Sequence, residues 1–510
     1  MKLVEPYQKL ICQVIKFLIS RRKIIREMIF FKYEKKLICL TDVSASATQY
    51  WHHDFEVKRE ETCKRTKYLE QLENNESKSS DQHFSEKDIC HGELSAGGDQ
   101  DNYEAGAGKE LEQEVKLWSD FLRTRFHPKT NVIVNDFHHS NTAEPFDIFG
   151  YGNDAWNNGT YAINDEFEDR IRFFVEESDS LKGFQMMTDG LTGFGGISAN
   201  IGEYIKDEFG SQCLLAFPVI PCISATEKFN PTMAANEVLN LALTLKTLAD
   251  TSSLVTPMSL SPDTFRLKRS GNHRQFPGFS NGAKFEEDYH SSAVLSLAMN
   301  TLSLPWRLLR GAYASPYEVS IGLNAYGRKI ASLELIAPFP KPIYEKLNTY
   351  LKSLEPSDRI FQDYQIPISP HADLASFNWH QSVATRGISG TDACNLDFLE
   401  FYSKNMPQTS TSVITSNNGI QVGLPFPHHI IETTTPFWDS KSKIIPTMTS
   451  WNSNPTSGSI AKTLSERLQK IKLAKMHRFQ DAGLEQEEYE AVVENLTVLS
   501  ECYQKPSDVM

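Results

Sequence analysis

Apolar and polar positions change their spacing in the middle of the chain, and this change predicts a strand, a helix and a second strand. Residues 183–187 form a short strand candidate, and residues 213–220 form a near-continuous apolar run. Between them, apolar side chains recur with a helical repeat on one face, namely Ile197, Ile201, Tyr204, Ile205 and Phe209. A strand that is apolar throughout is expected where both faces of a sheet are covered. The pattern predicts a β-α-β unit with a right-handed crossover.

The same alternation continues on both sides of this unit. Further strand candidates lie at residues 36–40, 131–134 and 253–256, and helix candidates lie at residues 111–122, 168–179 and 234–249. In the charged helix candidate 168–179, Ile171 and Phe174 form the apolar side. Strands that alternate with helices are typical of an α/β fold with a mostly parallel, doubly wound sheet.

The pattern changes after Pro257. Residues 258–288 are polar and loop-like, whereas residues 289–304 predict a helix and residues 330–337 predict a strand. Residues 405–460 are rich in Ser, Thr, Pro and Asn, so we expect loops to dominate there. Helical spacing returns near the end, in the apolar stripes of Leu464, Leu468, Ile471, Val492, Leu496 and Leu499. These features predict a second α+β domain followed by C-terminal helices.

These patterns divide the chain of 510 residues into five parts. We expect a divergent basic N-terminal region at 1–69, an acidic disordered insertion at 70–110, an α/β nucleotide-binding-like domain at 111–257, a second α+β domain with long loops at 258–460, and C-terminal helices at 461–510. No internal repeat is visible.

Charge is distributed unevenly along the chain, whose formal net charge is -13. Residues 70–114 hold thirteen Asp and Glu against three Lys, and a segment so polar and so charged is not expected to form a packed core. The acidity belongs largely to this segment and gives no support for nucleic-acid binding. The eight cysteines are scattered without a CxxC pair, which argues against a zinc site and favours a reducing compartment such as cytosol.

The first 36 residues have the opposite charge, with ten Lys and Arg against three acids. Residues 9–26 are basic and partly amphipathic, with Arg21, Arg22, Lys23 and Arg26 behind an apolar face. One interpretation is a membrane-surface or organelle-targeting helix. The other is a helix packed on the body of the protein, or an atypical start. No run of 18 apolar residues is present, so no membrane-spanning helix is expected.

The glycine-rich stretch GFQMMTDGLTGFGG, residues 183–196, carries the candidate chemistry. A glycine turn between a strand and a helix brings backbone N–H groups and the positive helix N-terminus to a phosphate. The candidate phosphate-loop residues are Gly190, Gly193, Gly195 and Gly196. The competing interpretation, which we favour, is that these glycines allow close packing or positive φ. No P-loop or GxSxG pattern occurs, and the pairs His138–His139 and His428–His429 are poor chelates, so we expect neither a catalytic residue nor a metal site.

The stretch resembles the signature loop GFQ…GGGTGSG of the tubulin superfamily, in an altered form. The first two signature glycines align with Leu191 and Thr192, and the phosphate-contacting threonine aligns with Phe194. The blocks DRIR (169–172), FPVIP (217–221) and ELIAPFP (334–340) occur in the tubulin order.

The chain is more closely similar to the misato family of tubulin-like proteins. The similarity lies in LWSDFLR (117–123), FVEESDSLKGFQ (174–185), SSLVTPMSL (252–260), SVATRGI (382–388) and FQDAG (479–483). This resemblance implies a tubulin-like fold and a role in mitochondrial distribution, morphology and fusion, in the cytoplasm and peripherally at the mitochondrial outer membrane. It also implies action through protein partners, with tubulin or the tubulin-folding chaperonin as candidates, rather than through catalysis or a cofactor.

Two features of a GTPase of this superfamily are missing from the sequence. Residues 1–35 contain no recognisable first strand and nucleotide-contacting loop, and no GxxNxD pattern occurs near residues 289–304. We therefore expect no GTP turnover. The alternatives are a tubulin-like protein that binds GTP and polymerises, or an assembly factor for microtubules or the spindle that acts with the chaperonin.

Overall fold

The computed structural model describes residues 28–33, 36–43, 131–138, 145–157, 163–178, 180–221, 230–260, 276–307, 314–339, 364–370, 378–387, 410–422, 426–431 and 444–504. The amphipathic stretch 9–26, the acidic insertion 70–110 and the helix expected at 111–122 lie outside these residues.

The first sheet has six strands in the order β3-β2-β1-β4-β5-β6. The strands are β1 (Met28–Tyr33), β2 (Lys36–Val43), β3 (Asn131–His138), β4 (Phe184–Asp189), β5 (Leu214–Val219) and β6 (Leu254–Val255). This is the order of a doubly wound α/β sheet, in which ligands bind where the order reverses, here between β1 and β4. The pairs β4–β5, β5–β6 and β2–β3 are parallel, so the predicted α/β fold is confirmed.

Strand β1 departs from the expected pattern. The sequence analysis found no strand before residue 36, and this was wrong, because β1 lies between β2 and β4. Its run MIFFKY directly follows helically spaced residues, so periodicity alone does not separate it. Strand β1 is antiparallel to both neighbours, and Phe30 pairs with Met187 near the end of β4. The beginning of β1 therefore lies at the carboxyl ends of the parallel strands. A parallel first strand would have ended there, and the loop after it would have followed at this edge.

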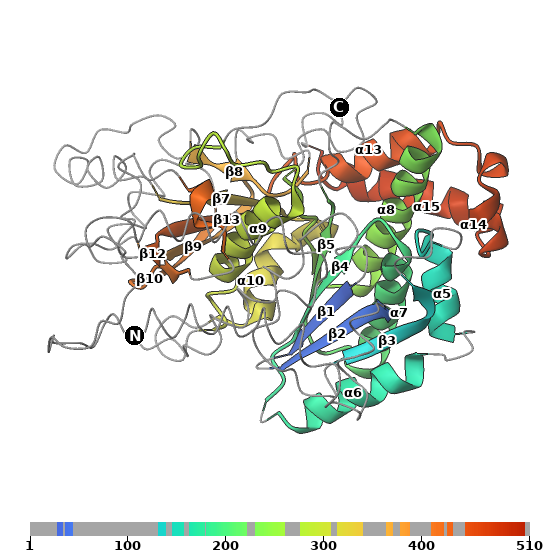
Figure 1. Ribbon diagram of the computed structural model, residues 1–510, viewed down its shortest axis with the longest axis horizontal. Helices are drawn as coiled ribbons and strands as arrows, with labels where there is room; N and C mark the ends of the chain where they lie inside the picture. The colour runs from blue at the N-terminus through green and yellow to red at the C-terminus, as the bar shows by residue number, and fades with distance from the viewer. Residues whose placement is uncertain are drawn as a thin grey trace, which may run out of the picture.

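In the described part of the chain, four helices accompany this sheet: α5 (Phe149–Asn157), α6 (Asn164–Glu176), α7 (Gly193–Glu208) and α8 (Pro231–Thr251). Helix α7 joins β4 to β5 and packs against both α5 and α8 (Figure 1). Its predicted apolar face is confirmed, since Ile197, Ile201 and Ile205 are buried. Helix α8 begins at an Asn230 cap followed by Pro231, which is a favourable helix start. Helix α5 was not predicted.

The second sheet has the order β10-β9-β13-β7-β8. Its strands are β7 (Ser332–Ile336), β8 (Ile366–Pro367), β9 (His380–Arg386), β10 (Ser410–Ser416) and β13 (Thr447–Ser453), and β11 (Ile420–Gln421) pairs with β12 (Ile444–Ile445) beside it. Helices α9 (Asp288–Leu302) and α10 (Pro316–Leu323) and the short turns η4 (Ala325–Gly327) and η6 (His428–Ile430) belong to this part.

The expectation that loops dominate residues 405–460 missed two strands of the second sheet, β10 and β13. Strand β10 forms an edge of the second sheet, and β13 lies in the middle of it with every residue buried. The error arose because β13 reads TMTSWNS, which is a polar sequence. Some of its buried polar side chains form hydrogen bonds, as Thr447 does with Thr301 and Ser450 with Asn452, a stabilisation that hydrophobic periodicity does not detect.

The chain ends in the predicted helices. Helices α13 (Ser459–Leu468), α14 (His477–Asp481) and α15 (Gln486–Glu501) are joined by the turn η7 (Leu473–Lys475). Figure 1 shows this C-terminal unit at one end of the molecule, where α13 and α15 pack against α8. Within the described part of the chain, no helix has the length and apolarity to cross a membrane.

Candidate functional site

The four candidate glycines lie between the carboxyl end of β4 and the first turn of α7. The glycine turn runs from Asp189, the last residue of β4, to Gly193, the first residue of α7, and Gly195 and Gly196 follow within the helix. It therefore lies beside the point where the strand order reverses, which is where an α/β sheet offers a ligand site. The sequence analysis placed the candidate loop correctly in the fold, between a strand and a helix N-terminus.

The Asp189 carboxylate occupies the inside of this turn. Its Oδ1 accepts a hydrogen bond from the Leu191 N–H at 2.8 Å, and its Oδ2 accepts one from the Thr192 hydroxyl at 3.0 Å. Asp189 and Thr192 are each only 1% exposed. A carboxylate next to a helix N-terminus is favoured by the same N–H groups and helix dipole that would favour a phosphate.

The other N–H groups of the turn also have partners within the protein. Gly193 N–H donates to the Phe146 carbonyl at 3.2 Å, and Gly195 N–H donates to the Thr192 carbonyl at 2.9 Å. The Thr192 side chain caps α7 by accepting from Phe194 N–H at 3.4 Å. Four N–H groups that could reach a phosphate, those of Leu191, Gly193, Phe194 and Gly195, are thus engaged internally.

The glycines also permit close contacts between helices. A Cβ atom added to Gly196 would lie 2.1 Å from the Phe149 carbonyl oxygen, and one added to Gly195 would lie 2.2 Å from Thr244 Oγ1. At Gly193 an added Cβ would lie 2.6 Å from the Phe146 ring, and at Gly190 it would lie 2.9 Å from a Leu241 methyl group. None of the four has a positive φ, so what the glycines supply is space for α5, α8 and the 146–149 segment.

Phe194 points into the protein interior. Its side chain is fully buried, and its ring meets the Phe146 ring edge-on with centroids 5.1 Å apart. The aromatic pair therefore lies where α7 begins. Apolar packing at this helix N-terminus excludes the water and counter-ions that normally accompany a bound phosphate.

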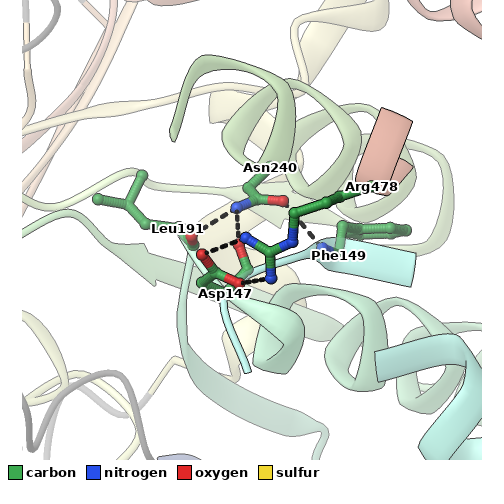
Figure 2. A network of polar contacts seen from close by, with 5 residues as sticks. All are labelled: Asp147, Phe149, Leu191, Asn240 and Arg478. Carbon is green, nitrogen blue, oxygen red and sulfur yellow. Dashed lines mark hydrogen bonds and ion pairs between the residues drawn. The ribbon is translucent and has the colours of Figure 1, made fainter. Parts of the chain in front are cut away.

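A polar network joins α8 and the 147–149 segment to the glycine turn (Figure 2). The Asn240 side chain, on α8, donates to the Leu191 carbonyl and to the Asp147 carbonyl, both at 2.7 Å, and accepts from Phe149 N–H at 2.8 Å. One amide thus connects α8, the glycine turn and the 147–149 segment. The sequence analysis missed Asn240, although an Asn inside the apolar helical run NLALTLK is a signal that could have indicated it.

The C-terminal unit joins this network through an ion pair. The Arg478 guanidinium donates to both Asp147 carboxylate oxygens, at 2.9 Å and 2.5 Å (Figure 2). These hydrogen bonds raise the pKa of Arg478 above its ordinary value. A Cβ on Gly150 would lie 2.5 Å from the Ala482 carbonyl oxygen, so the start of α5 and the end of α14 are in direct contact. No local pattern of residues indicates this long-range pair.

His429, from one of the two histidine pairs noted in the sequence, contacts His290, which was not singled out. Their Nε2 atoms lie 3.2 Å apart, and His290 Nδ1 accepts the Lys284 N–H at 3.0 Å. Because Nδ1 is an acceptor, the neutral His290 ring carries its proton on Nε2 and donates it to His429. Burial, and then the neighbouring His429, lower the pKa of His290 to about 4. The pair is therefore a hydrogen bond between neutral rings, and the described residues hold no cluster of three or more side chains suited to a metal.

Comparison with known proteins gives concordant matches. The family model of a tubulin domain matches residues 108–308. Protein misato homolog 1 of Mus musculus is 28% identical over 431 residues, covering 77% of this chain and 73% of the relative. The protein of the same name from Danio rerio is also 28% identical, over 78% of this chain and 70% of the relative. Protein misato of Drosophila melanogaster is 23% identical, over 77% of this chain and 72% of the relative.

Proposed function

Because the chain belongs to the misato family and carries a tubulin-like domain, we propose that it acts as a non-catalytic tubulin-like scaffold. In this proposal it regulates mitochondrial distribution, morphology and fusion by binding other proteins, and it works in the cytoplasm and peripherally at the mitochondrial outer membrane. Tubulin and the tubulin-folding chaperonin are the partners that the resemblance suggests.

The closed glycine turn is the observation that supports a scaffold over a GTPase. The Asp189 carboxylate accepts hydrogen bonds from Leu191 N–H and the Thr192 hydroxyl, and the Phe146 carbonyl accepts from Gly193 N–H. A phosphate would have to displace these acceptors and lie beside a buried carboxylate of the same sign. Like charges in a poorly solvated site repel strongly. The proposal is therefore that this chain uses no nucleotide cofactor, and that Gly190, Gly193, Gly195 and Gly196 act in packing.

The orientation of β1 supports the same proposal. In a parallel first strand, the loop that follows the strand would reach the carboxyl edge of the sheet beside the glycine turn. Here β1 is antiparallel to β4, so the edge near Met187 meets the beginning of β1. The described residues thus supply only one of the two loops that would normally hold a nucleotide between them.

Replacement in cells tests the proposed function. Cells depleted of the protein should show altered mitochondrial distribution, and re-expression of the wild-type chain should restore it. The variant Asp189→Asn keeps an oxygen acceptor for Leu191 N–H but removes the negative charge from the turn. If the protein acts as a scaffold, this variant should rescue mitochondrial distribution as well as the wild type does, once the two are expressed equally.

Three outcomes would argue against the proposal. Unchanged mitochondria after depletion would remove the mitochondrial role. A gain or loss of rescue in Asp189→Asn that follows a change in GTP affinity would indicate a nucleotide-dependent activity. Sedimentable polymer that forms only with GTP would favour the alternative of a polymerising tubulin relative.

A further inference from the structure

Exposed apolar side chains gather on one short segment of the second domain. Six large hydrophobic side chains are exposed among the described residues, and three of them lie within ten residues, at Tyr317 (56%), Ile321 (53%) and Tyr326 (88%). Tyr317 and Ile321 are four residues apart on α10, so they share a helix face. The opposite face of α10 is buried through Val319 and Leu323. We call Tyr317, Ile321 and Tyr326 the α10 patch.

The backbone at Tyr326 holds its ring outward at an energetic cost. Tyr326 has φ 59° and ψ 35°, a left-handed conformation that is unusual for a bulky side chain. Its ring lies 5.4 Å from the Arg328 guanidinium, which also lies 3.6 Å from the Trp379 ring. Arg328 Nε donates to the Cys502 carbonyl, and this hydrogen bond holds the guanidinium in place. Strain of this kind at an exposed aromatic side chain is a reason to look for a ligand.

Basic side chains surround the patch. Hydrogen bonds from Ser315, and then the charge of Lys182, hold the pKa of Glu318 below its usual range, which places Lys182 near the start of α10. Lys329 Nζ donates to the Ser252 carbonyl and Lys206 Nζ donates to the Asp250 carbonyl, both at 3.2 Å, so these two lysines meet at the end of α8.

With Arg328, these lysines give four basic groups. Acids also lie on these elements: Glu318 is on α10 itself, and Asp250 forms an ion pair with Lys246. Basic side chains from four positions therefore lie beside the apolar side chains of the patch.

We propose that the α10 patch is a membrane-docking surface that inserts Tyr317, Ile321 and Tyr326 into the headgroup region of an anionic bilayer. The inference rests on the peripheral membrane association in the proposed function and names the surface responsible for it.

A bilayer fits this surface better than a protein groove does. The three side chains stand more than half out of the surface, so they act as anchors and do not form the walls of a pocket. Tyrosine prefers the membrane–water interface, because its ring is apolar and its hydroxyl is polar. Lysine and arginine around such anchors are attracted to anionic lipid, and this attraction weakens with salt. An apolar centre with a basic rim is the composition of a peripheral membrane-binding surface.

Sedimentation with vesicles tests the surface in the full-length protein. The probes are vesicles of phosphatidylcholine mixed with phosphatidylserine, and vesicles of phosphatidylcholine alone. The wild type should bind the mixed vesicles, and binding should weaken in high salt and on phosphatidylcholine alone. The triple variant Tyr317→Gln, Ile321→Gln and Tyr326→Asn should bind roughly tenfold more weakly. Glutamine is a good helix former and asparagine tolerates positive φ, so the variant should fold.

Two comparison variants make the test specific. Met233→Gln with Val498→Gln removes apolar side chains of similar exposure, 47% and 53%, from α8 and α15, and should bind as the wild type does. The second variant replaces Arg21, Arg22, Lys23 and Arg26 with Gln and tests the basic stretch 9–26. If that variant loses vesicle binding while the triple α10-patch variant retains it, the inference is overturned.

Other results have equally definite meanings. A wild-type protein that binds neither kind of vesicle overturns the inference, and rescue of mitochondrial distribution in cells would still report on the proposed function. Self-association that is lost in the α10-patch variant, without vesicle binding, would assign the surface to a second copy of this chain and would also overturn it. Weaker vesicle binding of the α10-patch variant alone, with an unchanged melting temperature, supports it.

Discussion

Strands β4 and β5 of the first sheet and β13 of the second occupy similar interior positions but bury different side chains. Strand β5 reads LLAFPV and is apolar throughout, whereas β13 buries Thr, Ser or Asn at five of its seven positions. The first sheet packs against α7 and α8 through apolar side chains and through glycines that let backbones approach. Its stability should therefore depend on shape, because tightly packed interiors tolerate little added volume.

The second sheet is held by a connected set of polar groups. Gln381 Nε2 donates to Ser450 Oγ, which donates to Asn452 Oδ1 at 2.7 Å. Glu334 on β7 lies directly opposite Ser450 in the antiparallel pair of β7 and β13. Trp451 Nε1 donates to Thr256 Oγ1 at 2.9 Å and so links the two parts of the molecule. Stability here should depend on hydrogen bonding and protonation, and the two sheets should respond differently to substitution and to pH.

The largest expected effect is a loss of stability when a side-chain atom is added to the tightly packed helices of the first sheet. Gly196→Ala places a Cβ 2.1 Å from the Phe149 carbonyl oxygen, which only a backbone shift between α5 and α7 can relieve. We expect a loss of at least about 3 kcal/mol in the free energy of unfolding, measured by urea denaturation. Gly282→Ala is the control, since the nearest atom to its added Cβ is Ser280 Oγ at 3.8 Å. Equal stability of the two variants would contradict the close-packing role of the glycine turn.

The next effect concerns protonation in the second sheet. Burial raises the pKa of Glu334 to about 7, an effect that the nearby Asn452 amide offsets only in part. An acid with a raised folded pKa contributes stability below its unfolded pKa of 4.5, and this is lost as pH rises through 7. Glu334→Gln imitates the neutral acid, so at pH well above 7 it should be more stable than the wild type by up to ~3 kcal/mol. Urea denaturation at several pH values measures this.

The control is the direction in which the stability difference between Glu334→Gln and the wild type changes with pH. The advantage of Glu334→Gln should shrink steadily as the pH falls below 7 and should vanish below about 4.5. An advantage that does not change with pH would show that the pKa of Glu334 is the same in the folded and unfolded states, and would contradict its rise on burial. A Glu334→Gln variant that is less stable than the wild type at every pH would contradict the role given to burial.

A smaller loss of stability is expected from replacing Asn240, whose side-chain amide links α8, the glycine turn and the 147–149 segment. Asn240→Ala removes one acceptor and two donors, and leaves Phe149 N–H and the Leu191 carbonyl without their partner on α8. Unsatisfied buried backbone groups cost roughly 1–3 kcal/mol, so we expect a loss of about 2 kcal/mol in the free energy of unfolding. Asn495→Ala, at an exposed position of α15, is the control, with a change within about 0.5 kcal/mol. A loss no larger than that of the control would show that the network in Figure 2 does not hold the glycine turn.

The smallest effect is expected at the ion pair between Arg478 and Asp147. Both side chains are partly exposed, 42% and 31%, so water screens their attraction. We expect Arg478→Gln to cost about 1 kcal/mol in thermal or urea denaturation, and less in high salt. Hydrogen exchange should quicken in α14 and in residues 145–150 and stay unchanged in β13. Faster exchange throughout the molecule would contradict the conclusion that this ion pair acts only locally, between α14 and residues 145–150.

The sequence predicted those parts of the fold that rest on apolar periodicity. The spacing of Ile197, Ile201 and Ile205 located α7, and the apolar run at 213–220 located β5. It failed for β13, because a strand whose polar groups bond to each other in the interior has the composition of a loop. It failed for β1 as well, because MIFFKY directly follows helically spaced apolar residues and periodicity alone does not separate the two.

The candidate site was predicted in part. A strand, a glycine turn and a helix were expected at 183–196, and the structure has them there. The occupant of the turn was not expected, because Asp189 becomes an internal acceptor only through the geometry of Leu191 N–H and Thr192. The contact between Asp147 and Arg478 spans 331 positions, and no local pattern encodes such a distance.

The nucleotide content of the purified full-length protein tests the closed glycine turn most directly. Protein isolated without added nucleotide is denatured, and the released guanine nucleotide is counted per chain by ion-exchange chromatography, with αβ-tubulin treated in parallel as the positive control. A titration with fluorescent GTP detects any site emptied during purification. We predict far less than one nucleotide per chain and no saturable binding, because the Asp189 carboxylate and the Phe146 carbonyl hold the N–H groups that a phosphate needs. One guanine nucleotide per chain, or saturable GTP binding that Asp189→Asn strengthens, would contradict this account.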